Sequence, residues 1–226
     1  MVVQKDVFWK AAIITAIVFI LGVSLGILLE SSRVKEIRDE YKTVEVEWAD
    51  AKLQSSLFQV LSPKFCEASI QENLNFADKV YEEGLKIERY EDANRLSNED
   101  SLLYEKQRYT LFKLEFWLNS INLKEKCNAN YTNLVYFYLD DPSLTERPKQ
   151  DTLSIILKEL KQKYGQEIML IPIPLDLDIA TVNVVKTAYN ISVAPTILIN
   201  EKIKLEGLYS QEEIEEIIQN EQGKTN

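Results

Sequence analysis

The sequence contains no histidine, only two cysteines and only six glycines among its 226 residues. Without histidine there is no histidine-based catalytic triad, no imidazole base and no histidine metal ligand. No glycine-rich phosphate-binding loop is found. Lys and Arg number 26 against 36 Asp and Glu, a net charge of −10. Because phosphate binding needs clustered cations, we expect no nucleic-acid partner, and we also expect no metal and no other cofactor.

The longest uncharged stretch runs over the nineteen residues from Ala11 to Leu29. As a helix it would be about 28 Å long, which matches the hydrocarbon thickness of a bilayer. Phe8 and Trp9 precede it as interface aromatics. The alternative is a cleaved signal peptide, whose apolar core is shorter, roughly 7–15 residues. The sequence therefore predicts an N-terminal tail and a single-pass membrane anchor over residues 1–30.

The orientation of this anchor is predicted from its flanks. The basic residues before and after the span slightly favour a cytoplasmic C-terminal part by the positive-inside rule. The short N-terminal tail and the placement of the cysteines favour the opposite, and we expect the C-terminal region to be extracytoplasmic. Gly22 and Gly26 form a G-x-x-x-G spacing, which would allow two such helices to approach in a homodimer.

A helical stalk and hairpin region is predicted over residues 31–128. Its first helix has apolar residues at alternating spacings of three and four, a heptad seam: Val34, Ile37, Tyr41, Val44, Trp48, Ala51, Ser55 and Phe58. Such a seam is typical of a self-contained helical bundle, and the alternative is a coiled-coil homodimer or a groove for a partner helix. Ser62-Pro63 predicts the end of this helix and the start of the next.

Two further helices are expected on either side of a polar loop at residues 91–100. The second helix is predicted to carry one apolar face: Cys66, Ile70, Leu74, Ala77, Tyr81 and Gly84. The third has apolar residues seven apart, with Phe112 beside them: Leu102, Tyr109, Phe116 and Leu123. Together they predict an antiparallel helical hairpin.

The hairpin places the two cysteines at the same end. Residues that face each other across an antiparallel hairpin have indices with a constant sum, and for Cys66 and Cys127 the centre falls between Leu96 and Ser97, inside the loop. Packed helices bring Cα atoms within the roughly 7 Å that a disulfide needs. We therefore predict a Cys66–Cys127 disulfide, with two buried free thiols as the alternative.

After residue 128 the continuous helical spacing of apolar residues gives way to alternating strand and helix patterns. The sequence therefore predicts a mixed α/β domain over 129–220 and a disordered tail over 221–226. Residues 132–140 and 167–176 are predicted as strands, each followed by a helix. Pro172 and Pro174 restrict the second strand to a sheet edge. A hairpin around Asn200-Glu201 and a helix capped by Ser210 and Glu213 complete the order β-α-β-α-β-β-α.

The residues around "SVAPTILIN" carry a resemblance to the thioredoxin-fold family, together with this order of elements. The most specific positions of the resemblance are Tyr189, Ile191, Val193, Ala194, Pro195 and Thr196. The fold class is thus expected to be an α/β thioredoxin-like C-terminal domain. The resemblance implies that Pro195 follows a cis peptide bond and that the backbone at Val193 and Ala194 binds an extended peptide.

The sequence departs from this family at the loop after the first strand. Redox-active members have Cys-x-x-Cys there, whereas this chain has Asp140, Asp141, Pro142 and Ser143. Ser143 has no histidine to activate it as a nucleophile. Asp140 and Asp141 are either turn and cap residues or a weak cation site or acid–base pair.

Thiol–disulfide exchange requires a thiolate, so the thioredoxin-like module is expected to be redox-inactive. The leading hypothesis is a membrane-anchored protein that acts in interaction or assembly with an unidentified protein or peptide at the membrane surface. One alternative is a membrane-tethered thiol–disulfide oxidoreductase that uses Cys66 and Cys127. Another is a structural scaffold that dimerises through the heptad seam.

Overall fold

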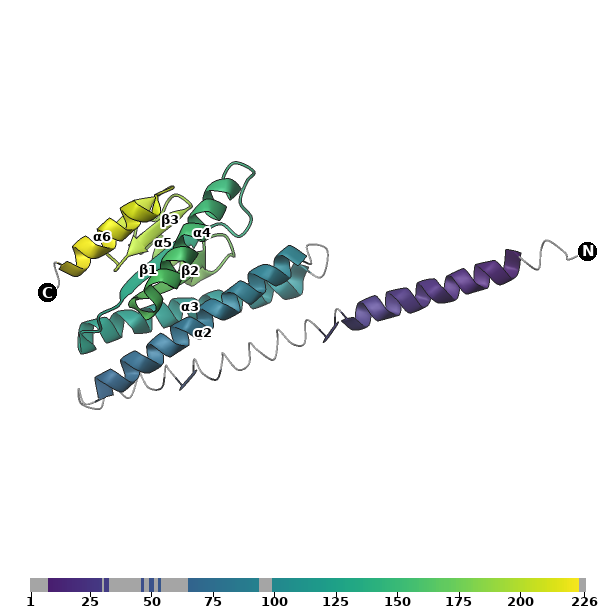
Figure 1. Ribbon diagram of the computed structural model, residues 1–226, viewed down its shortest axis with the longest axis horizontal. Coiled ribbons are helices and arrows are strands. Elements are labelled where there is room, and N and C mark those ends of the chain that lie inside the picture. The colour runs from purple at the N-terminus through teal and green to yellow at the C-terminus, as the bar shows by residue number, and fades with distance from the viewer. Residues whose placement is uncertain are drawn as a thin grey trace, which may run out of the picture. The chain divides into compact units, whose positions relative to one another are not determined.

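The computed structural model describes residues 8–29, 31–32, 46, 49–50, 53, 65–93 and 99–223 (Figure 1). The chain divides into two compact units, Met1–Val44 and Glu45–Asn226. Three predicted features lie outside the described residues: the heptad seam, the Ser62-Pro63 junction and the centre of the hairpin loop. Within the segment that carries the seam, only residues 46, 49–50 and 53 are described, and none of them belongs to the seam.

In the first unit, one helix covers Phe8–Leu29. Its 22 residues are all exposed within the protein, as expected for side chains that face lipid. A helix of this length and composition is able to cross a membrane, and N-terminal signal sequences share both properties.

The second unit contains a helical hairpin followed by a mixed α/β region. Its elements in chain order are α2 (Cys66–Ala93), α3 (Glu99–Cys127), β1 (Thr132–Tyr138), α4 (Arg147–Tyr164), the 3-10 turn η2 (Gly165–Glu167), β2 (Ile168–Pro174), α5 (Ala180–Ala188), β3 (Thr196–Ile199), β4 (Ile203–Glu206) and α6 (Gln211–Gly223). The predicted order β-α-β-α-β-β-α is confirmed. The first strand ends at Tyr138, two residues earlier than predicted, because the next residues enter a turn.

Helices α2 and α3 lie side by side in opposite directions (Figure 1). The predicted face of α3 is confirmed at Tyr109, Phe112, Phe116 and Leu123, which are buried, whereas the side chain of Leu102 lies outside the described part of the chain. The predicted face of α2 is only partly right. Among the side chains of α2 that the structure describes, Ser69, Asn73, Phe76, Ala77 and Val80 are buried, whereas Ile70, Leu74 and Tyr81 are half-buried. The buried face is rotated because α2 packs against both α3 and strand β2.

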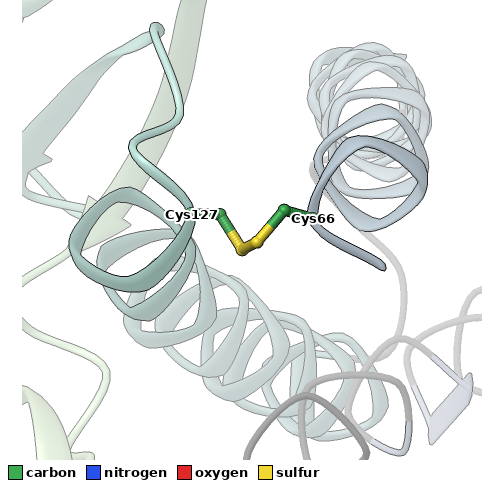
Figure 2. The surroundings of a disulfide bond; sticks show 2 residues. All are labelled: Cys66 and Cys127. Atoms are coloured by element: carbon green, nitrogen blue, oxygen red, sulfur yellow. A yellow bond between two sulfur atoms is a disulfide. The ribbon is translucent and has the colours of Figure 1, made fainter. Parts of the chain in front are cut away.

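The disulfide joins the first residue of α2 to the last residue of α3 (Figure 2). The Cα atoms of Cys66 and Cys127 are 5.3 Å apart, and the predicted pairing is confirmed. Both cysteines lie at the end of the hairpin away from its loop. The bond therefore ties the point where the chain enters the hairpin to the residues just before β1.

The four strands form one mixed sheet in the order β2-β1-β3-β4. β1 pairs in parallel with β2 and antiparallel with β3, and β4 pairs antiparallel with β3. β1 and β3 are thus the central strands. A parallel pair needs a crossover connection, which α4 provides between β1 and β2.

The two faces of the sheet are covered by different helices. On one face, α4 and α6 pack on alternate residues of the strands, forming a continuous core: Leu134, Tyr136, Leu153, Leu157, Leu160, Ile168, Ile197, Ile199, Leu205, Ile214 and Ile218. On the other face, α3 brings Trp117 against Phe137, with ring centroids 6.2 Å apart. Tyr189, directly after α5, also contacts Trp117 there. The sheet is buried on both faces, which explains its long apolar strands.

Strand β2 lies at the edge of the sheet, which confirms the position predicted from Pro172 and Pro174. The N–H of Leu175 donates to the carbonyl of Tyr138, so odd-numbered residues of β2 direct their amides toward β1. The nitrogens of Pro172 and Pro174 therefore point away from the sheet, where a strand needs no donor. The buried Lys161 ammonium lies on the same outer side, donating to the Ile168 carbonyl at 3.1 Å and to Asp78 at 2.6 Å.

Tyr131 connects the end of α3 to the start of β1. Its hydroxyl donates to the Ser120 carbonyl at 2.9 Å, and the ring is 4% exposed. Because burial disfavours the phenolate, the pKa of Tyr131 is raised to about 12.

We expect this pKa to make the protein lose stability at alkaline pH. The raised pKa in the folded state means that its contribution is complete below pH 10, the pKa of an unfolded tyrosine, and is lost as the pH rises toward 12. The expected loss is roughly 2–3 kcal/mol in the free energy of unfolding. Denaturant unfolding of wild type and Tyr131→Phe from pH 8 to pH 12 measures it. The variant lacks this ionisation, so parallel profiles for both proteins would contradict the assignment.

Candidate functional site

Three loops meet at one end of the sheet, beyond the C-terminal end of β1. The pairing of Phe137 with Thr196 brings the loop at 139–146 next to the residues that precede β3. The N–H of Gly207, after β4, donates to the carbonyl of Pro195 at 2.8 Å. We call this region the loop end of the sheet, formed by residues 139–146, 193–195 and 207–208.

The proline loop at 193–195 is held from within. The Ala194–Pro195 peptide bond is cis, as the resemblance implied. Pro195 and Thr196 are buried, Ala194 is half-buried and Val193 is 45% exposed. The Thr196 hydroxyl donates to the Val193 carbonyl at 2.6 Å. Within the described ranges, no hydrogen bond is formed by the backbone N–H or carbonyl of Ala194, so both groups are free to bind another molecule.

The loop after β1 is held in place by one carboxylate. Asp176 accepts the backbone N–H of Asp140 at 2.7 Å and that of Asp141 at 3.0 Å. The Lys106 ammonium on α3 in turn donates to both carboxylate oxygens of Asp140, each at 2.9 Å. An aspartate that is ion-paired in this way is a structural anchor of the loop. The interpretation of Asp140 as a turn residue is therefore favoured over an acid–base role.

Ser143 forms the turn that leads into α4. Its hydroxyl donates to Glu146 Oε2 at 2.6 Å and its N–H donates to the same oxygen at 3.1 Å. These hydrogen bonds lower the pKa of Glu146. The Ser143 carbonyl accepts the N–H groups of Glu146 and Arg147. Ser143 therefore acts as a turn residue whose hydroxyl is oriented toward Glu146.

The structure brings the two predicted loops together, and it places the Cys66–Cys127 disulfide away from them. Cys127 precedes β1 by five residues, at the end opposite the loop end of the sheet. The disulfide thus does not lie where redox-active members of the thioredoxin family have theirs. In the described parts of the chain, no group of three or more Cys, Asp or Glu side chains is arranged to hold a metal ion.

Sequence reasoning missed the exposed apolar side chains at the loop end of the sheet. Leu144 is 91% exposed, Leu208 is 52% exposed, and with Val193 they come from the three different loops. The only signal in the sequence is an isolated leucine within each of two polar loops. Asp176 and Lys106 were missed as well, because their partners are 35 and 34 residues away along the chain.

Comparisons with known proteins provide little beyond these observations. No protein-family model matches the chain, and no curated protein matches it. Matches exist among solved structures. One, described as "Structure of a malarial protein", is 18% identical and aligns with 40% of this chain and 97% of its own, with a TM-score of 0.33. At so low a TM-score, the fold of this chain is described from its own strands and helices.

Proposed function

We propose that this protein is a membrane-anchored, redox-inactive member of the thioredoxin-like class that binds an extended peptide segment of a partner protein. The observation that carries the proposal is the arrangement of the loop end of the sheet. A proline loop whose Ala194 backbone forms no hydrogen bond lies beside a cysteine-free loop in which the side chains of Asp140 and Ser143 are already engaged. Such a region presents a binding surface without the nucleophile that thiol exchange requires.

Backbone and side-chain groups at this surface suit an extended peptide. The N–H and carbonyl of Ala194 supply one donor and one acceptor, the pattern by which a strand recognises another strand. Val193, Leu144 and Leu208 surround them with exposed apolar surface. Backbone pairing supplies affinity, and apolar contacts on alternate side chains supply selectivity for a peptide with spaced hydrophobic residues.

The disulfide-closed end of the helical hairpin lies far from this surface. Cys66 is the first residue of α2 and is tied to Cys127 at the N-terminal side of β1. The loop end of the sheet lies at the other end of β1, seven residues or about 23 Å away. We propose that the second unit lies on the extracytoplasmic side, where a disulfide persists.

The proposal predicts that an aspartate at position 193 weakens peptide binding. Peptides are selected from a random library with the full chain in nanodiscs, and one is titrated by fluorescence anisotropy. Val193→Asp places a charge in the apolar surface, and we expect the dissociation constant to rise about fivefold or more. Val184→Asp is the matched control, because Val184 is 67% exposed on α5, outside the loop end of the sheet.

Two outcomes would overturn the proposal. Equal loss of affinity in both variants would place the peptide elsewhere or indicate a general charge effect. Reduction of insulin by the wild-type chain, at a rate that disappears in a Cys66→Ser/Cys127→Ser variant, would favour a membrane-tethered oxidoreductase. We expect insulin reduction at the buffer rate for both proteins.

A further inference from the structure

A cavity of about 360 Å³ lies along the outer edge of β2, where the helical hairpin and α4 meet that strand. Side chains from α2, α3, β1, α4 and β2 line it, among them Tyr81, Tyr138, Arg147, Ser154, Leu170 and Pro172. The loop after β1 borders both this cavity and the loop end of the sheet, but residues 193–195 and 207–208 do not line the cavity. We call it the β2-edge cavity.

Two ion pairs, one near each end of β2, hold the hairpin to the rest of the second unit around this cavity. At the start of β2, the Lys161 ammonium of α4 donates to Asp78 of α2 at 2.6 Å and to the Ile168 carbonyl at 3.1 Å. At the other end, Lys106 of α3 donates to Asp140 at 2.9 Å. The walls are therefore fixed by the fold, which lowers the free-energy cost of ordering them around a bound molecule.

The outer edge of β2 presents backbone acceptors to the cavity and only one donor. Even-numbered residues of β2 direct their backbone groups away from β1, and Leu170, Pro172 and Pro174 line the cavity. In the part of the chain that the structure describes, the carbonyls of these three residues accept no hydrogen bond. Pro174 is buried and the other two are half-buried. Buried carbonyls are almost always paired, and proline has no N–H, so a molecule in the cavity has to supply donors.

One cation of the cavity has no partner among the described residues. The ionisable side chains of the lining are more often basic than acidic: Lys106, Lys113, Arg147, Lys158, Asp140 and Asp151. The three lysines are engaged by other groups. The guanidinium of Arg147, by contrast, forms no hydrogen bond or ion pair with any described residue. Arg147 is half-buried at the first position of α4, and its planar donors match a carboxylate, which accepts two of them at once.

Aromatic rings form much of the apolar wall. Tyr136 and Tyr138 of β1 stack on each other with ring centroids 5.5 Å apart, and both line the cavity together with Tyr81 of α2. Flat rings of this kind suit an aromatic or branched apolar group. Small-molecule sites have volumes of roughly 300–1,000 Å³, so a cavity at the low end of this range favours a ligand of the size of one amino acid.

We propose that the β2-edge cavity binds a small apolar amino acid. The carboxylate of the ligand binds the guanidinium of Arg147, its ammonium group donates to the outward carbonyls of β2, and its side chain packs against the tyrosine rings. The two charged groups of such a molecule match the two polar features of the cavity that have no partner among the described residues. The proposal is independent of the peptide surface at the loop end of the sheet.

Calorimetric titration of the full chain in nanodiscs with L-phenylalanine and with L-leucine tests the ligand, with empty nanodiscs as the blank. We expect saturable binding with a dissociation constant of about 1 mM or below. Phenylpropionate lacks the ammonium group and phenethylamine lacks the carboxylate, so each is expected to bind at least about tenfold more weakly than L-phenylalanine. Either analogue binding as tightly as L-phenylalanine would overturn the proposal, as would the absence of saturable binding by both amino acids.

Two variants test the place of binding. Arg147→Met removes the guanidinium and is expected to raise the dissociation constant of L-phenylalanine at least about tenfold. Lys149→Met is the matched control, because Lys149 is exposed in the same turn of α4 and does not line the cavity. Ser154→Leu fills the cavity from α4 and should abolish binding, with thermal unfolding as the check that the fold is retained. Binding by Arg147→Met as tight as that by wild type would place the carboxylate elsewhere and overturn the proposal.

Discussion

Replacement of Trp117 by alanine is expected to lower the free energy of unfolding by about 3–5 kcal/mol. Trp117 is 1% exposed. Its side chain extends from α3 into the space between the sheet and Tyr189, the residue after α5. Its ring contacts those of Phe137 and Tyr189, at centroid distances of 6.2 and 5.4 Å. The truncation would leave a cavity. The helix α3, the sheet and the segment after α5 cannot move to fill this cavity, because other contacts hold each of them in place.

The indole nitrogen adds a polar contribution that is separable from packing. Trp117 Nε1 donates to Glu201 Oε1 at 2.7 Å, and the amide nitrogen of Asn133 donates to the same oxygen at 3.0 Å. Urea unfolding of Trp117→Phe, Glu201→Ala and the double variant measures this contact as a coupling energy, expected at about 1–2 kcal/mol. Glu201→Gln retains an acceptor oxygen and is expected to lose less than Glu201→Ala.

A result that ranks these variants differently would contradict the assignment. If Trp117→Ala cost no more than Trp117→Phe, the ring would not fill the space between α3 and the sheet. If the two single losses simply added in the double variant, Trp117 and Glu201 would not be in contact.

Removal of the disulfide is the second large effect we expect. The bond closes a loop of 61 residues that contains almost all of α2 and α3. In the chain-entropy model, opening such a loop in the unfolded state destabilises the fold by about 4 kcal/mol. Thermal unfolding of Cys66→Ser/Cys127→Ser against wild type under oxidising conditions measures the effect. Addition of reductant should bring wild type to the value of the variant and leave the variant unchanged.

Peptide mapping without reduction tests the bond itself. Protein is isolated from its native membrane with free thiols blocked, and we expect one cross-linked peptide containing Cys66 and Cys127. Alkylation of both cysteines would refute the disulfide under native conditions. It would also weaken the extracytoplasmic placement of the second unit, since disulfides are rare where glutathione keeps thiols reduced.

Local sequence patterns predicted those elements whose hydrogen bonds close within a few residues. Ser210 and Glu213 cap α6 as expected, with Ser210 N to Glu213 Oε2 at 2.8 Å. Gly165 ends α4 with a φ of 54°, and Asn200 and Glu201 both have positive φ in the turn between β3 and β4. At Gly165 and Asn200 the residue type favours the positive φ, whereas Glu201 adopts it because a two-residue hairpin turn requires it at both central positions.

The candidate site was predicted only in part, because its loops are adjacent in the fold and distant along the chain. Val193–Thr196 and Asp140–Ser143 were named from the sequence, but the roles of Lys106, Asp176 and the exposed Leu144 were not. An ion pair such as Lys106 with Asp140 leaves no periodic signal, since each residue alone is an ordinary surface charge. Only the folded chain shows which charges are engaged.

The sequence by itself determined the apolar N-terminal helix, the helical hairpin with its paired cysteines, the order of strands and helices, and the absence of a cysteine pair beside Pro195. These follow from local periodicity, turn chemistry and the index arithmetic of a hairpin. Tertiary structure alone decided the strand order β2-β1-β3-β4, the rotated buried face of α2 and the exposure of Leu144 beside Val193 at the loop end of the sheet. The reason is physical: apolar periodicity marks which side chains are able to be buried, whereas the packing of neighbouring elements determines which of them are.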